Sequence, residues 1–205
     1  MNHFEYDDYA PVLNKCPKLR KIIKKAGPCT IEVSSRINLF SRLARVIAYQ
    51  QLTAKAASTI FARFLDLYKT KEASLKPEMV IKSKVEDLRT AGLSQAKSLA
   101  ILDLAQKSLD GTLPPVNKLK KMSDEEVIKA LTQVRGIGPW SAEMFMMFTL
   151  GRADIISLGD LGLKKGFGLL YKKNQMPTDE EFIKRSNKWK PYRTVACWYL
   201  WRALE

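Results

Sequence analysis

The sequence predicts an all-helical fold. Apolar residues recur at spacings of three and four over long stretches, as on the buried face of an amphipathic helix. Paired polar residues mark several helix starts, and no stretch shows a convincing strand pattern. The 205 residues, 46% of them hydrophobic, suffice to bury a core without disulfide or metal staples.

Two helices are expected on either side of a turn at residues 50–53. Their apolar positions follow helical spacing in both segments. The positions are Leu39, Phe40, Leu43, Val46 and Ile47 before the turn, and Ala56, Ala57, Ile60, Phe61, Phe64 and Tyr68 after it.

Helix starts and stops are marked along the whole chain. Three capping boxes are predicted, in which two side chains satisfy free backbone N–H groups at a helix start. They pair Ser83 with Glu86, Ser123 with Glu126, and Thr178 with Glu181. Helix stops are expected at Gly92 and Gly111, first helical turns at Pro139 and Pro191, and a connector at Pro114 and Pro115.

Residues 131–142 predict two helices joined by a tight Gly-Ile-Gly turn. The first helix has a buried face at Val127, Ile128, Leu131 and Val134, and the second is expected to bury Phe145 and Phe148. Glycines without a Cβ let a phosphate approach the free backbone N–H groups of such a turn. The alternative is a plain structural connection between helices.

One acidic residue, Asp160, follows this turn by about twenty residues. It precedes a predicted helix over residues 161–171, whose first backbone amides would favour a negative charge. The alternative role is a helix cap without chemistry.

The charge balance favours a polyanionic partner. There are 35 Lys and Arg against 21 Asp and Glu, a formal charge of +14, in short clusters between apolar helical positions. A lysine-rich solvated surface is the alternative. Three unevenly spaced cysteines, Cys16, Cys29 and Cys197, suggest buried thiols and a reducing compartment. No transmembrane or signal segment is recognised, so an intracellular protein is expected.

Several classes of chemistry lack their residues. His3 is the single histidine, which disfavours a serine triad, a histidine base and a histidine-rich metal site. Neither a Walker loop nor a deaminase zinc signature is present. Catalysis would therefore rest on carboxylates, lysines or tyrosines.

Four motifs, in order, resemble those of the helix-hairpin-helix (HhH-GPD) DNA glycosylase superfamily, in its alkylbase or 3-methyladenine DNA glycosylase II branch. They are Ile47-Ala-Tyr-Gln-Gln-Leu-Thr53, Gly92-Leu-Ser-Gln-Ala-Lys97, Gly136-Ile-Gly-Pro-Trp-Ser-Ala-Glu-Met144, and Trp189-Lys-Pro-Tyr-Arg-Thr194 with Trp198-Tyr-Leu-Trp201. The resemblance implies a two-lobed helical fold with the DNA and base pocket in the cleft between the lobes. Residues 1–36 with 171–205 would form a terminal lobe, and residues 37–170 a central core with the hairpin at 134–140.

The resemblance also implies roles for individual residues. Asp160 matches the essential aspartate, which stabilises the positive charge that builds on the sugar when the glycosidic bond breaks. The remaining roles are a base pocket of Trp140, Tyr192 and Tyr49; DNA backbone contacts from Arg135, Gly136, Ile137, Gly138, Ser94 and Lys97; and a minor-groove wedge of Gln51, Leu52 and Thr53. Ordinary packing is the alternative for each aromatic residue, and Trp198 and Trp201 are assigned to the core.

Three departures refine the expectation. Trp140 stands where the bifunctional lyases carry a nucleophilic lysine, so a monofunctional enzyme is implied. The cysteines cannot supply an iron-sulfur cluster, so no metal or cofactor is expected beyond a monovalent cation at the hairpin when DNA is bound. Ser157 replaces a proline usual before the aspartate, which predicts a freer loop.

The predicted function is excision of alkylated purines, of the 3-methyladenine and 7-methylguanine class, from double-stranded DNA by a monomer. It would act in the cytoplasm of a bacterium or the nucleus of a eukaryote. The alternatives are a non-catalytic damage or abasic-site DNA-binding protein of the same fold, and a general helix-hairpin-helix module.

Overall fold

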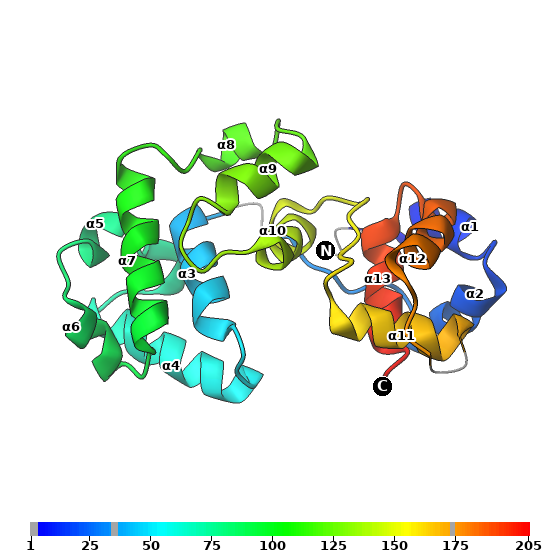
Figure 1. Cartoon of the computed structure of the whole chain (residues 1–205), viewed down its shortest axis with the longest axis horizontal. Coiled ribbons are helices and arrows are strands. Elements are labelled where there is room, and N and C mark those ends of the chain that lie inside the picture. Colours follow the sequence, from blue (N-terminus) through cyan, green and yellow to red (C-terminus); the bar gives the residue numbers. More distant parts are fainter. Residues whose placement is uncertain (1–3, 34–36, 173–174) are drawn as a thin grey trace. The chain divides into compact units, whose positions relative to one another are not determined.

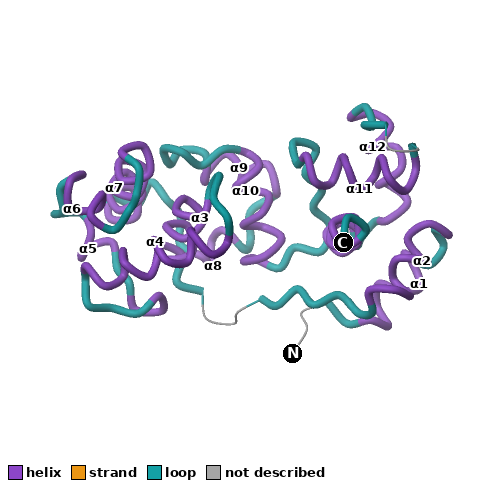
Figure 2. The backbone as a smooth tube through the Cα atoms, turned by 90° about the horizontal axis from the view of Figure 1, so that it is seen from below, coloured by secondary structure: helices purple, strands orange, loops and turns teal. Residues whose placement is uncertain are grey.

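The structure is all-α, as predicted. The computed structural model describes residues 4–33, 37–172 and 175–205, and every regular element within them is a helix (Figure 2). The chain divides into two compact units, Ser34–Phe145 and Met1–Val33 with Met146–Glu205. None of the described helices has the length and apolar content that crossing a lipid bilayer requires.

The first unit is built around the long helix α7, which packs against α3, α5 and α6 (Figure 1). Helix α10 contacts both α9 and α3, so the hairpin is docked on the helix that precedes residues 50–53. The helices are α3 (Leu39–Tyr49), α4 (Ala54–Leu67), α5 (Pro77–Val80), α6 (Val85–Thr90), α7 (Gln95–Leu109), α8 (Val116–Leu119), α9 (Asp124–Leu131) and α10 (Pro139–Phe145), with a 3₁₀ turn at Glu72–Ser74.

The second unit is built around α13, which packs against α11 and α2 (Figure 1). All of residues 194–200 are buried, so α13 has no solvent-facing side over two turns. The helices are α1 (Tyr6–Leu13), α2 (Pro17–Ala26), α11 (Leu161–Tyr171), α12 (Asp179–Ser186) and α13 (Arg193–Arg202), with a π-helical turn at Met146–Leu150 and a 3₁₀ turn at Asn187–Trp189.

Most of the predicted boundaries are confirmed. Helices α3 and α4 flank the turn at residues 50–53. The capping boxes at Ser123 and Thr178 form as expected, and Gly92 and Gly111 follow helix ends with φ of +98° and +81°. Helix α10 begins at Pro139.

Two of the predicted boundaries are wrong. Helix α6 begins one residue later than Ser83 and Glu86 predict. The Asp87 carboxylate accepts the Lys84 N–H at 2.8 Å, while the Ser83 hydroxyl bonds the Tyr68 hydroxyl. Pro191 lies two residues before the first residue of α13, outside the helix.

The division into units differs from the predicted one. The prediction assigns residues 146–170 to the central core, whereas the structure groups them with the chain termini. The reason is the close packing of α11 on α13. A Cβ built on Gly166 would lie 2.2 Å from the Leu200 carbonyl oxygen, so only glycine fits at this crossing.

Candidate active site

Asp160 lies at the N-cap of α11, where the sequence predicts it. Its Oδ1 accepts the Leu163 backbone N–H at 2.7 Å and the Trp201 indole N–H at 3.1 Å. The side chain is buried, with 8% of the residue exposed. A carboxylate at a helix start with two N–H donors interacts favourably with its surroundings while charged. The cap and the candidate catalytic group are therefore the same side chain.

Trp201 is the partner that the sequence does not predict. The sequence assigns it to the core, but it is only half-buried, and it contacts Asp160 across a sequence separation of 41 residues. Its indole also packs on Phe148, with ring centroids 5.8 Å apart. Phe148 was expected to be buried and is 40% exposed, because the π-helical turn at Met146–Leu150 shifts its register relative to Phe145. Trp198 is buried, as expected.

Gly162 makes room for this contact. A Cβ at this position would lie 3.1 Å from Asp160 Oδ1 and 3.1 Å from both Cδ1 and Nε1 of Trp201. Gly166, one turn further along α11, lets the two helices approach closely enough for Trp201 to reach the carboxylate. Two glycines of α11 thus set the geometry around Asp160.

The segment before Asp160 is held in place despite the absence of proline. Ser157 is fully buried, and its carbonyl accepts the Asp160 N–H at 3.4 Å, which closes a turn. Further back, Thr194 accepts the Ile155 N–H at 3.1 Å and donates its hydroxyl to the Arg152 carbonyl at 2.6 Å. Contacts with the start of α13 thus hold the loop where a proline is usual, and the freer loop stays a prediction.

A charged pair strengthens this connection. The Arg193 guanidinium donates to both carboxylate oxygens of Asp154, at 2.8 and 3.0 Å, and to the Asp154 carbonyl at 2.8 Å. An arginine–carboxylate pair with two parallel hydrogen bonds is stronger and more specific in geometry than a pair with one. It fixes the first residue of α13 to the loop that leads to Asp160.

The hairpin turn carries two backbone N–H groups suited to an anion. Gly136 has φ of +76°, and a Cβ there would lie 3.2 Å from the Ala100 Cβ. Gly138 faces open space, with no atom within 4 Å of a built Cβ. Among the described residues, no acceptor is recorded for the N–H of either glycine. Ile137 is buried and its N–H bonds the Val134 carbonyl, so it anchors the turn rather than facing outward.

Two polar side chains that the sequence does not single out position the hairpin. Gln50 donates its amide to the Gly136 carbonyl at 2.8 Å and to the Ser141 hydroxyl at 3.2 Å. Asp103 of α7 accepts the Arg135 backbone N–H at 2.7 Å and the Lys107 ammonium at 2.8 Å. The contacts of Gln50 with Gly136 and of Asp103 with Arg135 join segments more than 30 residues apart, so no local sequence signal predicts them.

The predicted wedge forms a protruding loop. Gln51 has φ of +57°, a left-handed conformation uncommon for residues other than glycine. Leu52 is 41% exposed, which is high for a leucine. Thr53 has a structural role as the N-cap of α4, where its hydroxyl accepts the Ala56 N–H at 3.3 Å.

Lys97 forms hydrogen bonds with the backbone at the start of this loop. Its ammonium donates to the carbonyls of Ala48 and Gln50, at 2.9 and 2.8 Å, and so caps the end of α3. Burial lowers the pKa of Lys97 below its usual value. Ser94 caps α7 by accepting the Lys97 N–H. DNA contacts from Ser94 and Lys97 stay predictions beside these structural roles.

The predicted pocket aromatics are distributed over both units. Trp140 is 44% exposed next to the hairpin turn, and Tyr49 is half-buried between Arg45, at 4.3 Å, and Phe61. Both belong to the first unit. Tyr192 lies in the second unit with Asp160, half-buried against Tyr9.

Metal ligands do not gather anywhere in the described part of the chain. Within residues 4–33, 37–172 and 175–205, no three His, Cys, Asp or Glu side chains come close enough to hold an ion. His3 lies outside the described residues.

Comparison with known proteins places the chain among DNA repair proteins. Residues 44–191 match the family described as HhH-GPD superfamily base excision DNA repair protein. The alkylbase DNA glycosidase-like protein mag2 of Schizosaccharomyces pombe is 32% identical over 185 residues, covering 90% of this chain and 87% of mag2.

Two solved structures are similar in fold and in sequence. A DNA-3-methyladenine glycosidase from Bacillus halodurans superposes with a TM-score of 0.81 at 38% identity, over 94% of this chain and 86% of that one. The S. pombe 3-methyladenine DNA glycosylase Mag1, in complex with abasic DNA, also gives a TM-score of 0.81, at 30% identity and over 95% of both chains.

Proposed function

Because the chain belongs to the HhH-GPD superfamily of base excision DNA repair proteins, we propose that it is a monofunctional DNA glycosylase for alkylated purines. It hydrolyses the N-glycosidic bond of bases of the 3-methyladenine and 7-methylguanine class and leaves an abasic site. The observation that carries this proposal is Asp160, a buried carboxylate held by two N–H donors at the start of α11.

The chemistry suits a single carboxylate. A purine alkylated at N3 or N7 carries a positive charge, so it departs as a neutral base without a general acid. Cleavage leaves positive oxocarbenium character on the deoxyribose, and a fixed negative charge beside C1′ lowers the energy of that state. Water then forms the new bond to C1′ and its proton passes to solvent.

The first unit is proposed to bind the DNA backbone and to fill the gap in the duplex. The N–H groups of Gly136 and Gly138 would bind a backbone phosphate without reading sequence. Leu52, at the tip of the loop that Lys97 supports, would fill the space left by the flipped nucleotide. Trp140, Tyr192 and Tyr49 are proposed to stack on the extruded base, where an electron-rich ring attracts a cationic purine.

The proposed hydrolysis needs only Asp160 and water, so no cofactor takes part. Trp140 occupies the position of the lyase lysine, and an indole cannot form a Schiff base with the sugar. A monovalent cation at the hairpin in the DNA complex and a monomeric state are part of the same proposal. An enzyme that repairs chromosomal DNA would work in the cytoplasm of a bacterium or in the nucleus of a eukaryote.

Product analysis on methylated duplex DNA tests this function. The protein should release 3-methyladenine or 7-methylguanine, detected by chromatography, and the strand should break only after alkali treatment. Strand cleavage without alkali would contradict the monofunctional assignment. No base release together with tight abasic-site binding would instead identify a non-catalytic damage-binding protein.

A further inference from the structure

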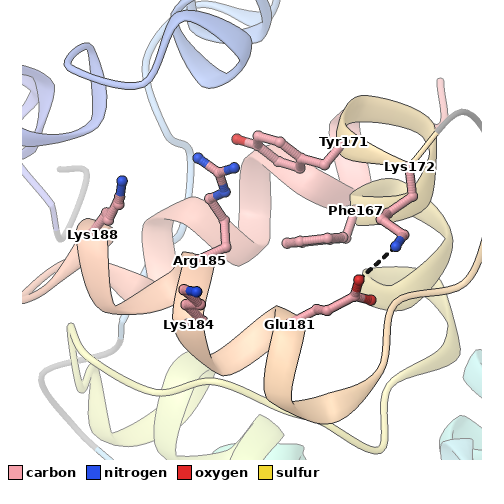
Figure 3. Close-up of a pocket in the computed structure, with 7 residues that line it drawn as sticks. All are labelled: Phe167, Tyr171, Lys172, Glu181, Lys184, Arg185 and Lys188. Atoms are coloured by element: carbon pink, nitrogen blue, oxygen red, sulfur yellow. Dashed lines mark hydrogen bonds and ion pairs between the residues drawn. The ribbon is translucent and has the colours of Figure 1, made fainter.

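The second unit carries a basic cavity at the far end of α11 from Asp160. A hollow of about 300 Å³ is lined by Phe167, Tyr171, Lys172, Glu181, Lys184, Arg185 and Lys188 (Figure 3). A second hollow of about 350 Å³ shares Arg185 and Lys188 with the first, and is also lined by Lys15, Cys16, Pro17 and Trp189. Asp160 is the N-cap of α11 and Tyr171 is its last residue, so the cavity lies about 16 Å along the helix from Asp160.

The charges at this cavity are strongly unbalanced. Glu181 is paired with Lys172, at 2.5 Å. In the part of the chain that the structure describes, Lys15, Lys184, Arg185 and Lys188 have no acidic partner. Four cations thus border two hollows that share lining residues, and the single acidic lining residue is already paired. Such a concentration of positive charge attracts anions.

Arg185 is held in a position suited to binding. Its guanidinium lies 5.0 Å from the centre of the Tyr171 ring, and Figure 3 shows the two side chains next to each other. The Tyr171 hydroxyl is fixed in turn by Cys16, with 2.9 Å between oxygen and sulfur. A guanidinium stacked on a ring keeps its N–H donors at its edge, where they match the oxygens of a phosphate.

The start of α2 and the Trp189 side chain border the second hollow. Helix α2 starts at Pro17 with neither a side-chain cap nor an acidic residue in its first turn, although helix starts favour negative charge. The indole N–H of Trp189 is fully buried and has no acceptor among the described residues. A buried donor without an acceptor is costly, and Trp189 lines the hollow that Arg185 and Lys188 share.

We propose that Lys15, Lys184, Arg185 and Lys188 form a second ligand site, which binds a phosphate group separately from the hairpin and from Asp160. The phosphate belongs either to a DNA backbone or to a small phosphorylated molecule. The recognition chemistry is the same for both sources. This site does not depend on the glycosylase activity.

Calorimetric titration with inorganic pyrophosphate tests the site on the full chain. The double variant Arg185→Gln/Lys188→Gln should bind pyrophosphate at least about tenfold more weakly than the wild type, because two of the four cations are lost. The control Lys71→Gln/Lys82→Gln removes the same charge from exposed positions of the other unit and should bind like the wild type. If the double variant is poorly folded by circular dichroism, the single exposed-site variant Lys188→Glu replaces it.

The salt dependence of binding to undamaged duplex DNA distinguishes the two sources. If backbone phosphates occupy the site, the slope of log affinity against log salt should fall by roughly two in the double variant. If the slope is unchanged while pyrophosphate binding is lost, the ligand is a small phosphorylated molecule. Pyrophosphate binding that is absent in the wild type, or equal in wild type and double variant, would overturn the proposal.

Discussion

The Trp201 indole donates its N–H to Oδ1 of Asp160 at 3.1 Å, joining the end of α13 to the start of α11. The same oxygen accepts the Leu163 backbone N–H. Trp201 is thus a positioning residue for the candidate catalytic carboxylate. Its contact depends on the glycines that bring α11 and α13 together.

Replacing Trp201 by phenylalanine should slow base release by roughly fivefold, because an aromatic ring is kept and one hydrogen bond worth about 1 kcal/mol is lost. Affinity for abasic DNA should change less than the rate. The measurement is single-turnover release of 3-methyladenine at saturating enzyme. Trp198→Phe, which alters a buried indole that packs on Tyr199, is the control. Equal loss in both variants would point to general destabilisation rather than positioning.

Adding one methyl group at Gly162 should disturb the same contact. The new Cβ in Gly162→Ala would press on Asp160 Oδ1 and on the Trp201 indole, and displacing a catalytic group by a few tenths of an ångström should cost on the order of tenfold in rate. Gly159→Ala is the matched control, since its Cβ meets no atom within 4 Å and its φ is not in the left-handed region. An unchanged rate for Gly162→Ala would contradict the proposed packing.

A carboxylate at Gly138 should weaken DNA binding. Gly138 faces open space, so Gly138→Asp should fold normally, but its charge would repel a phosphate at the hairpin amides. Affinity for undamaged and abasic duplexes should fall at least about tenfold, measured by fluorescence anisotropy. Asn117→Asp adds the same charge at an exposed position of α8 and controls for net charge. Comparable losses in both variants would count against the phosphate site.

The three cysteines should differ sharply in reactivity. Burial raises the pKa of the Cys29 thiol from 9.0 to about 11, so at pH 8 its reactive thiolate is roughly a hundredfold scarcer than in an unfolded chain. Cys197 is equally inaccessible, whereas Cys16 is partly exposed. Labelling with a thiol reagent at pH 8 should modify Cys16 in the native protein and all three after unfolding, as read by mass spectrometry. Rapid native labelling of Cys29 would contradict the packing of the second unit.

The raised pKa of Cys29 also has a consequence for stability. A thiol whose folded pKa lies above its unfolded value contributes stability that is complete below pH 9 and lost as the pH rises through about 11. Cys29→Ala should reduce this alkaline loss relative to the wild type. Its unfolding free energy is to be measured by denaturant titration at pH 8 and pH 10.5.

Local sequence signals predict much of this structure. The N-cap position of Asp160 and the extent of α11 follow from capping chemistry within a few residues. The hairpin helices and the capping boxes at Ser123 and Thr178 follow from the same kind of local pattern. Local signals also failed at Ser83 and Pro191, where the helix begins one residue and two residues later than predicted.

The contacts that complete the site come from distant segments and carry no such signal. The contact of Trp201 with Asp160 carries no signal because residues 194–200 of α13 are buried on every side, so the helix has no one-sided apolar pattern. Gln50 and Asp103 position the hairpin across separate helices. Phe148 was misplaced because a π-helical turn breaks the spacing of three and four.

The carboxylate of Asp160 is the centre of the proposed chemistry, and one rate comparison tests its role. Asp160→Asn retains an oxygen that can accept the hydrogen bonds of Leu163 and Trp201, but it removes the negative charge. The single-turnover rate of 3-methyladenine release from methylated duplex DNA should fall by about a thousandfold or more, with abasic-DNA affinity retained. Equal rates for wild type and Asp160→Asn would contradict the assignment of Asp160 as the catalytic residue.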